Sequence, residues 1–91
     1  MADFAAWYRR EDYKRIRQIM DDRDKFPVSF DEWEKKAKST VARALAQGIV
    51  LKPFIIDPEK FLAFCKERNI PAGSEARAMF SIERGLAQDM N

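Results

Sequence analysis

One apolar run, GIVLKPFIIDP from Gly48 to Pro58, does most to limit what this chain can fold into. Residues 49–56 are rich in β-branched and aromatic side chains, and the run is too short for a typical helix, so we expect a strand there. Successive side chains point to opposite faces, and both faces would be largely apolar and need cover. Pro53 cannot donate a ladder hydrogen bond, which predicts an edge strand or a bulge.

The rest of the sequence offers little for this strand to pair with. The one other short extended segment, KFPVSF, contains Pro27, and backbone groups buried without partners cost about 1–3 kcal/mol each. A second copy of the chain, pairing antiparallel about a two-fold axis, would satisfy both strands at once. We therefore predict a homodimer, and its interface residues are Val50, Leu51, Lys52, Phe54, Ile55 and Ile56. Two alternatives stay open: a connector lying across the helices with water completing its bonds, and pairing within the chain to residues 26–30.

The first helix is expected over residues 3–20, where the sequence has no Gly or Pro and Asp3 can cap the helix start. Its apolar stripe is interrupted by Glu11 and Asp12, and the helix can bend or break at that point.

Three further helices are each marked by a capping signal. Ser29 with Glu32 forms a capping box, Asp57 precedes a proline at the first helical position, and Ser74 can cap the last helix. Gly48 supplies a left-handed residue that ends the second helix.

These elements predict a mostly helical α+β fold of about four helices and one short strand. The 91 residues form a single small domain, 1–91, with residues 1–12 as a possible peripheral N-terminal extension. A domain of this size buries only about 60–65% of the surface that its unfolded chain exposes, so the core is thin.

Composition gives no strong functional signal. Seventeen basic and 15 acidic residues leave a formal net charge of +2, which does not by itself favour nucleic acid or an anionic membrane. A single cysteine excludes an internal disulfide, and the chain opens without a targeting segment, so we expect a cytoplasmic protein. No stretch approaches the roughly 20 apolar residues of a membrane span, and no membrane association is expected.

Catalytic and metal-binding patterns are missing. The chain has no histidine, which removes the commonest general base and nitrogen ligand. Cys65 lies on an apolar helical face and is typical of an inert packing group. The group Asp21, Asp22 and Asp24 lacks the ligand spacing of a calcium loop, and we expect a solvated turn. We predict no enzyme activity, no cofactor and no metal.

Two other features suggest binding. The stretch YRREDYKRIR interleaves basic residues with Tyr8 and Tyr13, and such side chains can neutralise phosphates and stack on unpaired nucleobases. The basic residues are Arg9, Arg10, Lys14, Arg15 and Arg17. A solvated face or an acidic protein partner explains the same charges. Trp7 and Trp33 could anchor a partner, but their helical spacing from Phe4 and Phe30 favours core packing.

The segments FPVSFDEWEKKA, GIVLKPFIIDPEKFLAFCKERNIP and SEARAMF, in this order, resemble a group of small uncharacterised bacterial proteins, a family of unknown function. The resemblance covers roughly Tyr13 to Leu86. It implies a bacterial cytoplasmic protein and no particular activity. The expected function is therefore that of a non-catalytic, homodimeric protein-interaction module with an unknown protein partner. The alternative is a small nucleic-acid-binding regulator that uses the basic first helix.

Overall fold

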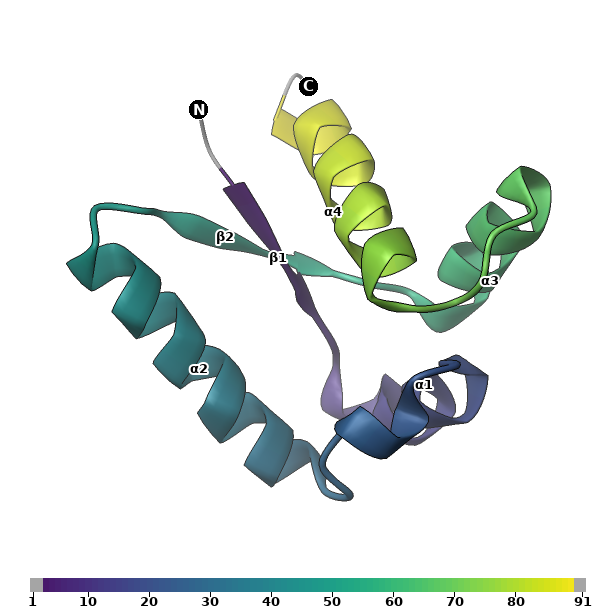
Figure 1. Ribbon diagram of the computed structural model, residues 1–91, viewed down its shortest axis with the longest axis horizontal. Helices are drawn as coiled ribbons and strands as arrows, with labels where there is room; N and C mark the ends of the chain where they lie inside the picture. Colours follow the sequence, from purple (N-terminus) through teal and green to yellow (C-terminus); the bar gives the residue numbers. More distant parts are fainter. Residues whose placement is uncertain (1–2, 90–91) are drawn as a thin grey trace.

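Residues 3–89, which the computed structural model describes, form four α-helices and a two-stranded parallel sheet (Figure 1). The strands are β1 (Asp3–Trp7) and β2 (Leu51–Ile55). The helices are α1 (Tyr13–Ile19), α2 (Phe30–Ala46), α3 (Pro58–Arg68) and α4 (Ser74–Asp89), with short 3₁₀ turns at Arg10–Asp12 and Arg23–Lys25. The mostly helical α+β class predicted from the sequence is confirmed.

The prediction of a helix from residue 3 was wrong, because β1 occupies its first five positions. β1 pairs with β2 in a parallel register that runs from Asp3 opposite Leu51 to Trp7 opposite Ile55. The chain therefore supplies the partner strand that the sequence did not reveal, and pairing with residues 26–30 is not what the structure shows. The helix α1 begins only at Tyr13, just after the polar interruption in the apolar stripe.

Each face of the sheet is covered by one helix. The Trp7 ring lies 5.1 Å from Trp33 of α2, whereas Phe4 on the opposite face lies against Gly85 of α4. A Cβ atom at position 85 would lie 2.7 Å from the Phe4 ring, so glycine allows this close approach. In Figure 1, α2 and α4 accordingly lie on opposite sides of the two strands.

Local capping bonds fix the starts of α2 and α3 as the sequence predicts, whereas α4 begins at Ser74 itself and the Arg77 N–H donates to the Gly73 carbonyl oxygen. The Ser29 hydroxyl accepts a hydrogen bond from the Glu32 N–H at 3.2 Å, and α2 begins at the next residue. Asp57 accepts two N–H bonds of 3.0 Å at the start of α3. Gly48 follows α2 with φ of +83°, the left-handed conformation that glycine adopts without strain.

The core lies where α1, α3 and α4 surround one end of the sheet. Its buried hydrophobic residues are Tyr8, Tyr13, Ile16, Met20, Ile56, Phe61, Phe64, Cys65, Ala72, Ala76 and Phe80. Within the described chain, α2 has no buried residue. It packs on the core through the partly buried Phe30 and Trp33, so this helix is the least enclosed of the four.

Candidate functional site

The outer edge of β2 is open. The Ile56 N–H donates to the Trp7 carbonyl oxygen at 2.8 Å, on the side that faces β1. Because the backbone groups of a strand alternate in direction, the N–H groups of Leu51 and Ile55 point away from β1. For residues 3–89, the sheet contains no third strand that could take up these groups. Two donors and the carbonyl groups beside them are thus available to an added strand.

Pro53 lies on this same outward side, midway along the edge. A proline there removes an N–H that would otherwise face away from the sheet, and the pairing with β1 is unaffected. The edge position that the sequence predicted for Pro53 is the one the structure shows. Proline at such a position discourages unspecific strand addition, since one ladder bond is missing from any partner.

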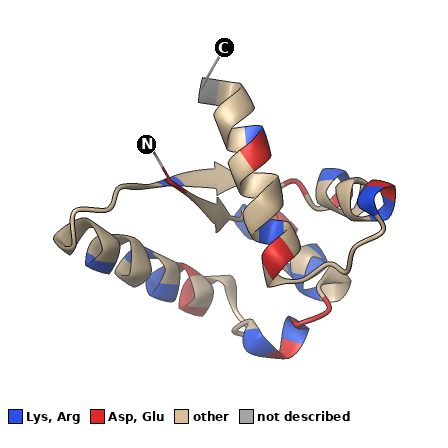
Figure 2. Cartoon of the chain, turned by 45° about the horizontal axis from the view of Figure 1, so that its top comes forward, with Lys and Arg blue, Asp and Glu red and all other residues tan. Residues whose placement is uncertain are grey.

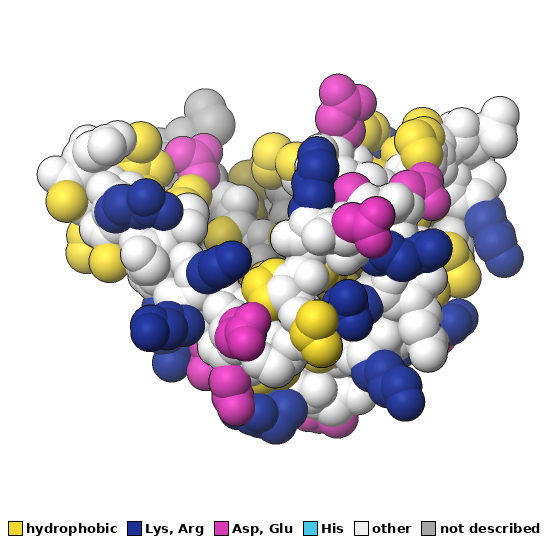
Figure 3. All heavy atoms as spheres, turned by 60° about the horizontal axis from the view of Figure 1, so that its bottom comes forward, with side chains coloured by type: hydrophobic (Ala, Val, Ile, Leu, Met, Phe, Trp, Pro, Cys, Tyr) yellow, Lys and Arg dark blue, Asp and Glu magenta, His cyan; other side chains and the backbone are white. Residues whose placement is uncertain are grey.

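Exposed apolar side chains gather at the C-terminal end of α2 and just before β2, and a further one, Ile55, lies at the far end of β2. Leu45 is 61% exposed, Val50 58%, Ile55 49% and Ile49 41%. Figure 3 shows hydrophobic side chains on the lobe at the left, which these two segments form. Large apolar residues that cluster on a surface mark interaction sites more often than single exposed residues do.

The six residues predicted as a dimer interface divide into two groups. Ile56 is fully buried in the core and the Phe54 ring packs 6.0 Å from Phe80, so these two side chains face inward. The other four lie at the surface: Val50, Leu51, Lys52 and Ile55, of which Leu51 is half-buried. The surface group surrounds the outward backbone groups described above.

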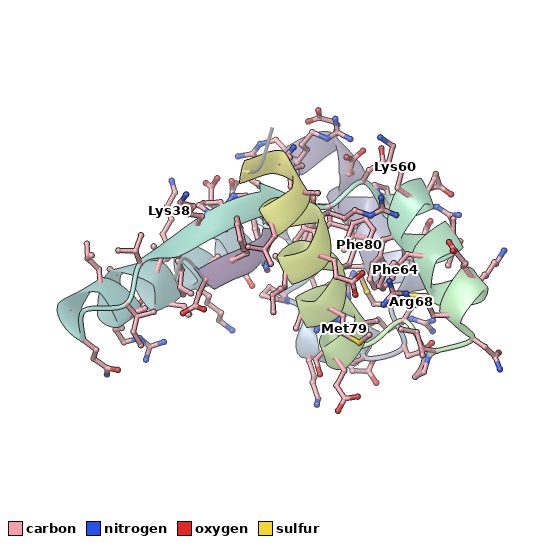
Figure 4. The ribbon with its side chains drawn as sticks, turned by 90° about the horizontal axis from the view of Figure 1, so that it is seen from above. Lys38, Lys60, Phe64, Arg68, Met79 and Phe80 are labelled. Carbon is pink, nitrogen blue, oxygen red and sulfur yellow. The ribbon has the colours of Figure 1, made fainter. Side chains whose placement is uncertain are left out.

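A groove of about 530 Å³ adjoins the end of β2, between α3 and α4. Ile55, Phe64 and Phe80 lie along it, and Lys60 and Arg84 stand at its rim. Figure 4 shows Phe64 and Phe80 between the two helices, with Lys60 beyond them. The sequence did not reveal this groove, because it depends on how α3 and α4 diverge.

The basic cluster of residues 9–17 is largely neutralised within the chain. Arg9 pairs with Asp12 at 2.7 Å, and Arg10 pairs with Asp31 at 2.7 Å. Arg15 donates two hydrogen bonds to Glu59, at 2.9 and 3.1 Å. These bonds hold the pKa of the Glu59 carboxyl below its usual value.

The other members of that cluster are placed differently from one another. Lys14 is exposed, whereas Arg17 is half-buried and its Nε has no hydrogen-bond partner among the described residues. The tyrosines are buried: Tyr8 and Tyr13 are each 3% exposed, and the Tyr13 hydroxyl donates to the Pro27 carbonyl at 2.6 Å. They are not available to stack on a base.

The two tryptophans belong to an aromatic cluster. Trp33 lies 5.1 Å from Trp7, 4.9 Å from Tyr8 and 5.4 Å from Phe30, measured between ring centroids. Both tryptophans are half-buried. This arrangement matches the packing role that the sequence favoured.

Three further observations concern the thiol, the acidic side chains and the helices of residues 3–89. Cys65 is buried, and burial raises the pKa of its thiol, which disfavours the nucleophilic thiolate. Among residues 3–89, no three His, Cys, Asp or Glu side chains are grouped to hold a metal ion. Over the same part of the chain, no helix combines the length and apolar character needed to span a bilayer.

The sequence analysis did not predict one partly buried ion pair. Asp22, expected in a solvated turn, receives two bonds of 2.8 Å from Arg77 of α4. The helical spacing of the sequence could have predicted this pair. At 3.6 residues per turn, Arg77 falls between Ala76 and Ser81 on the buried side of its helix. An arginine at such a position requires an acidic partner.

Comparison with protein-family models, with curated proteins and with solved structures finds no match to this chain. The resemblance to small bacterial proteins therefore stays a prediction. What the geometry defines is a small α+β protein with a two-stranded sheet, an open outer edge on β2 and apolar side chains beside that edge.

Proposed function

We propose that the protein is a non-catalytic protein-interaction module, and that the outer edge of β2 is its binding surface. The observation that carries this proposal is the outward direction of the Leu51 and Ile55 N–H groups, next to exposed apolar side chains. An open strand edge is a template for main-chain pairing with another strand. The chain has no histidine and its single thiol is buried, which supports a binding role over a catalytic one.

The partner at this edge is a second copy of the chain, so the module acts as a homodimer. Antiparallel pairing of two β2 edges with Pro53 on the two-fold axis would place Leu51 opposite Ile55 of the second copy. Each Leu51 and each Ile55 would then both donate and accept, giving four hydrogen bonds, and the missing proline donors would fall together at the centre. The exposed Ile55 and Val50 side chains would lose contact with water in the same step.

The mass in solution tests this proposal. The wild-type protein is expected to show twice its chain mass of 10.6 kDa by light scattering at micromolar concentration. Leu51→Pro removes one outward N–H and leaves the bonds to β1 intact, so we expect a monomer. Leu51→Ala is the matched control, because it removes the side chain but keeps the donor, and we expect it to remain largely dimeric.

Two results would contradict the proposal: a wild-type protein that stays monomeric at 100 µM, or a Leu51→Pro variant as dimeric as Leu51→Ala. Circular dichroism of each variant shows whether the fold is retained. We place this dimer in the reducing cytoplasm, which is consistent with one free cysteine.

A further inference from the structure

The charge of this chain is unevenly distributed. Residues 35–56, which cover most of α2 and all of β2, contain five basic residues and no acidic one. The rest of the chain holds 12 basic and 15 acidic residues. In Figure 2, basic positions recur along α2, and its acidic positions are confined to its first turns. A net charge of +2 therefore conceals one strongly positive segment.

Part of this charge lies on the outward face of α2. Lys35, Lys36 and Arg43 line a shallow hollow along the helix, with Ser39 and Thr40 between them. The Thr40 hydroxyl donates to the Lys36 carbonyl oxygen at 3.1 Å, so Ser39 supplies the hydroxyl donor of this hollow. All five residues are exposed, and positions 35 to 43 span about 12 Å of helix. Glu32 closes the hollow at the N-terminal end and is its one acidic lining residue among those described.

These bases differ from Arg9, Arg10 and Arg15 in having no acidic partner among residues 3–89. No ion pair joins Lys35, Lys36 or Arg43 to a carboxylate within residues 3–89, whereas Arg10 and Arg15 are both paired. On the same helix, Lys38 points elsewhere and lies 3.6 Å from Glu34. Unpaired cations on one helix face leave a positive field that an external anion can complement.

We propose that this face of α2 binds the phosphate backbone of double-stranded nucleic acid without reading its sequence. Lysine, arginine, serine and threonine side chains are among the groups that contact phosphates in such complexes, and 12 Å of duplex carry about seven phosphate charges. A duplex is favoured over a single strand because the face has no aromatic side chain on which a base could stack. A bilayer is disfavoured, since no apolar residue lies between the bases to enter it.

Fluorescence anisotropy with a 20-base-pair duplex tests the assignment in the intact protein. Three phosphate contacts predict a slope of about −2.7 in log affinity against log salt, and hence about a 40-fold loss between 50 and 200 mM salt. Replacing Lys35, Lys36 and Arg43 together by Gln should abolish both the binding and its salt dependence. The matched control replaces Lys25, Lys60 and Lys66 by Gln, which removes the same charge elsewhere and should change affinity by less than 3-fold.

Four results would overturn the proposal: no duplex binding by the wild type, equal loss in both triple variants, undiminished binding by the α2 variant, or tighter binding to a single strand of equal length. A parallel titration with phosphatidylserine vesicles and with an acidic peptide identifies the other anionic partners. Binding to either of these in the absence of duplex binding would also count against it. Since all six substituted side chains are exposed, unchanged thermal unfolding is expected and checks that each variant is folded.

Discussion

At the scale of single residues, we expect the ion pair between Asp22 and Arg77 to contribute more to the stability of the fold than the exposed ion pairs do, because it is screened less by water. The two side chains are 18% and 14% exposed, and two bonds of 2.8 Å join them. The Arg77 guanidinium also lies 4.9 Å from the Phe26 ring, so α4 is tied to the loop that follows α1. Burial acts to lower the pKa of Arg77, but the hydrogen bond to Asp22 and nearby charges outweigh burial and raise it.

The first prediction concerns the pH dependence of this contact. The hydrogen bond from Arg77 lowers the pKa of Asp22 below its ordinary value near 4, so the carboxylate stabilises the fold above that pH. This stabilisation should disappear as the pH falls through the lowered pKa. We expect Asp22→Asn to reduce the free energy of unfolding by about 1.5–3 kcal/mol at pH 7, and the difference from wild type to shrink as the pH falls through the lowered pKa.

Urea unfolding at pH 7, 4.5 and 2.5 measures this difference. Asp24→Asn is the control, because Asp24 is an exposed acid in the same turn, and it should change stability by less than about 0.5 kcal/mol. A difference between wild type and Asp22→Asn that stays constant over the whole pH range would show that the pair does not stabilise the fold through its charge.

At the scale of the elements, the two-stranded sheet depends on contacts between distant parts of the sequence. β1 and β2 are 48 positions apart in register, and each has one edge facing the other. The alternation of backbone groups makes this arrangement testable residue by residue. The N–H groups of Ala5, Trp7 and Phe54 point into the pair, and those of Ala6 and Ile55 point out of it.

Amide hydrogen exchange followed by NMR should reproduce this alternation. In dilute protein we expect slow exchange at Ala5, Trp7 and Phe54 and fast exchange at Leu51 and Ile55, because only the first group has partners within the chain. If β2 pairs with a second copy, Leu51 and Ile55 should become protected as the concentration rises. Exchange at these two amides that is independent of concentration would contradict pairing through this edge, and uniform exchange along β2 would contradict the register itself.

The elements differ in how far the sequence alone could predict them. The starts of α2 and α3 were predictable because the side chains of Ser29 and Asp57 cap them locally. β1 was not predictable in this way. Phe4 and Trp7 are three positions apart, which is typical of one helix face, yet in the strand they cover opposite faces of the sheet. Its conformation is set by β2, and the local pattern carries no trace of that partner.

In the candidate site too, local features were predictable from the sequence and features that depend on tertiary contacts were not. The sequence placed Pro53 correctly on an edge, since a missing N–H is a local property. It could not show which side chains of residues 50–56 would face outward, because that depends on where α4 packs. The charges of residues 9–17 were visible in the sequence, but their neutralisation by Asp31 and Glu59 depends on contacts across the fold. For the same reason, the sequence could not show that Lys35, Lys36 and Arg43 of α2 have no acidic partner among residues 3–89.

At the scale of the whole molecule, α2 is less firmly anchored than the three helices that form the core. The buried core joins α1, α3 and α4, whereas α2 has no buried residue among those described and is attached largely through aromatic rings. The two proposed binding surfaces lie on α2 and on the outer edge of β2, the strand that follows it. A lightly packed segment is free to present its polar face and its strand edge to partners, at the cost of low local stability.

The last prediction tests whether Trp33 attaches α2 to the rest of the fold. Trp33 contacts four aromatic rings at centroid distances of 4.9–6.0 Å, so Trp33→Ala should lower the free energy of unfolding by roughly 2–4 kcal/mol. Leu45→Ala on the same helix removes a side chain that is 61% exposed, and it should change stability by less than about 0.5 kcal/mol. Urea unfolding measures both, and hydrogen exchange locates the loss. Because α2 is joined to the core mainly at Trp33, we expect its amides to lose protection in Trp33→Ala before those of α3 and α4. An equal loss of amide protection in α2, α3 and α4 would show that α2 and the core unfold as one unit.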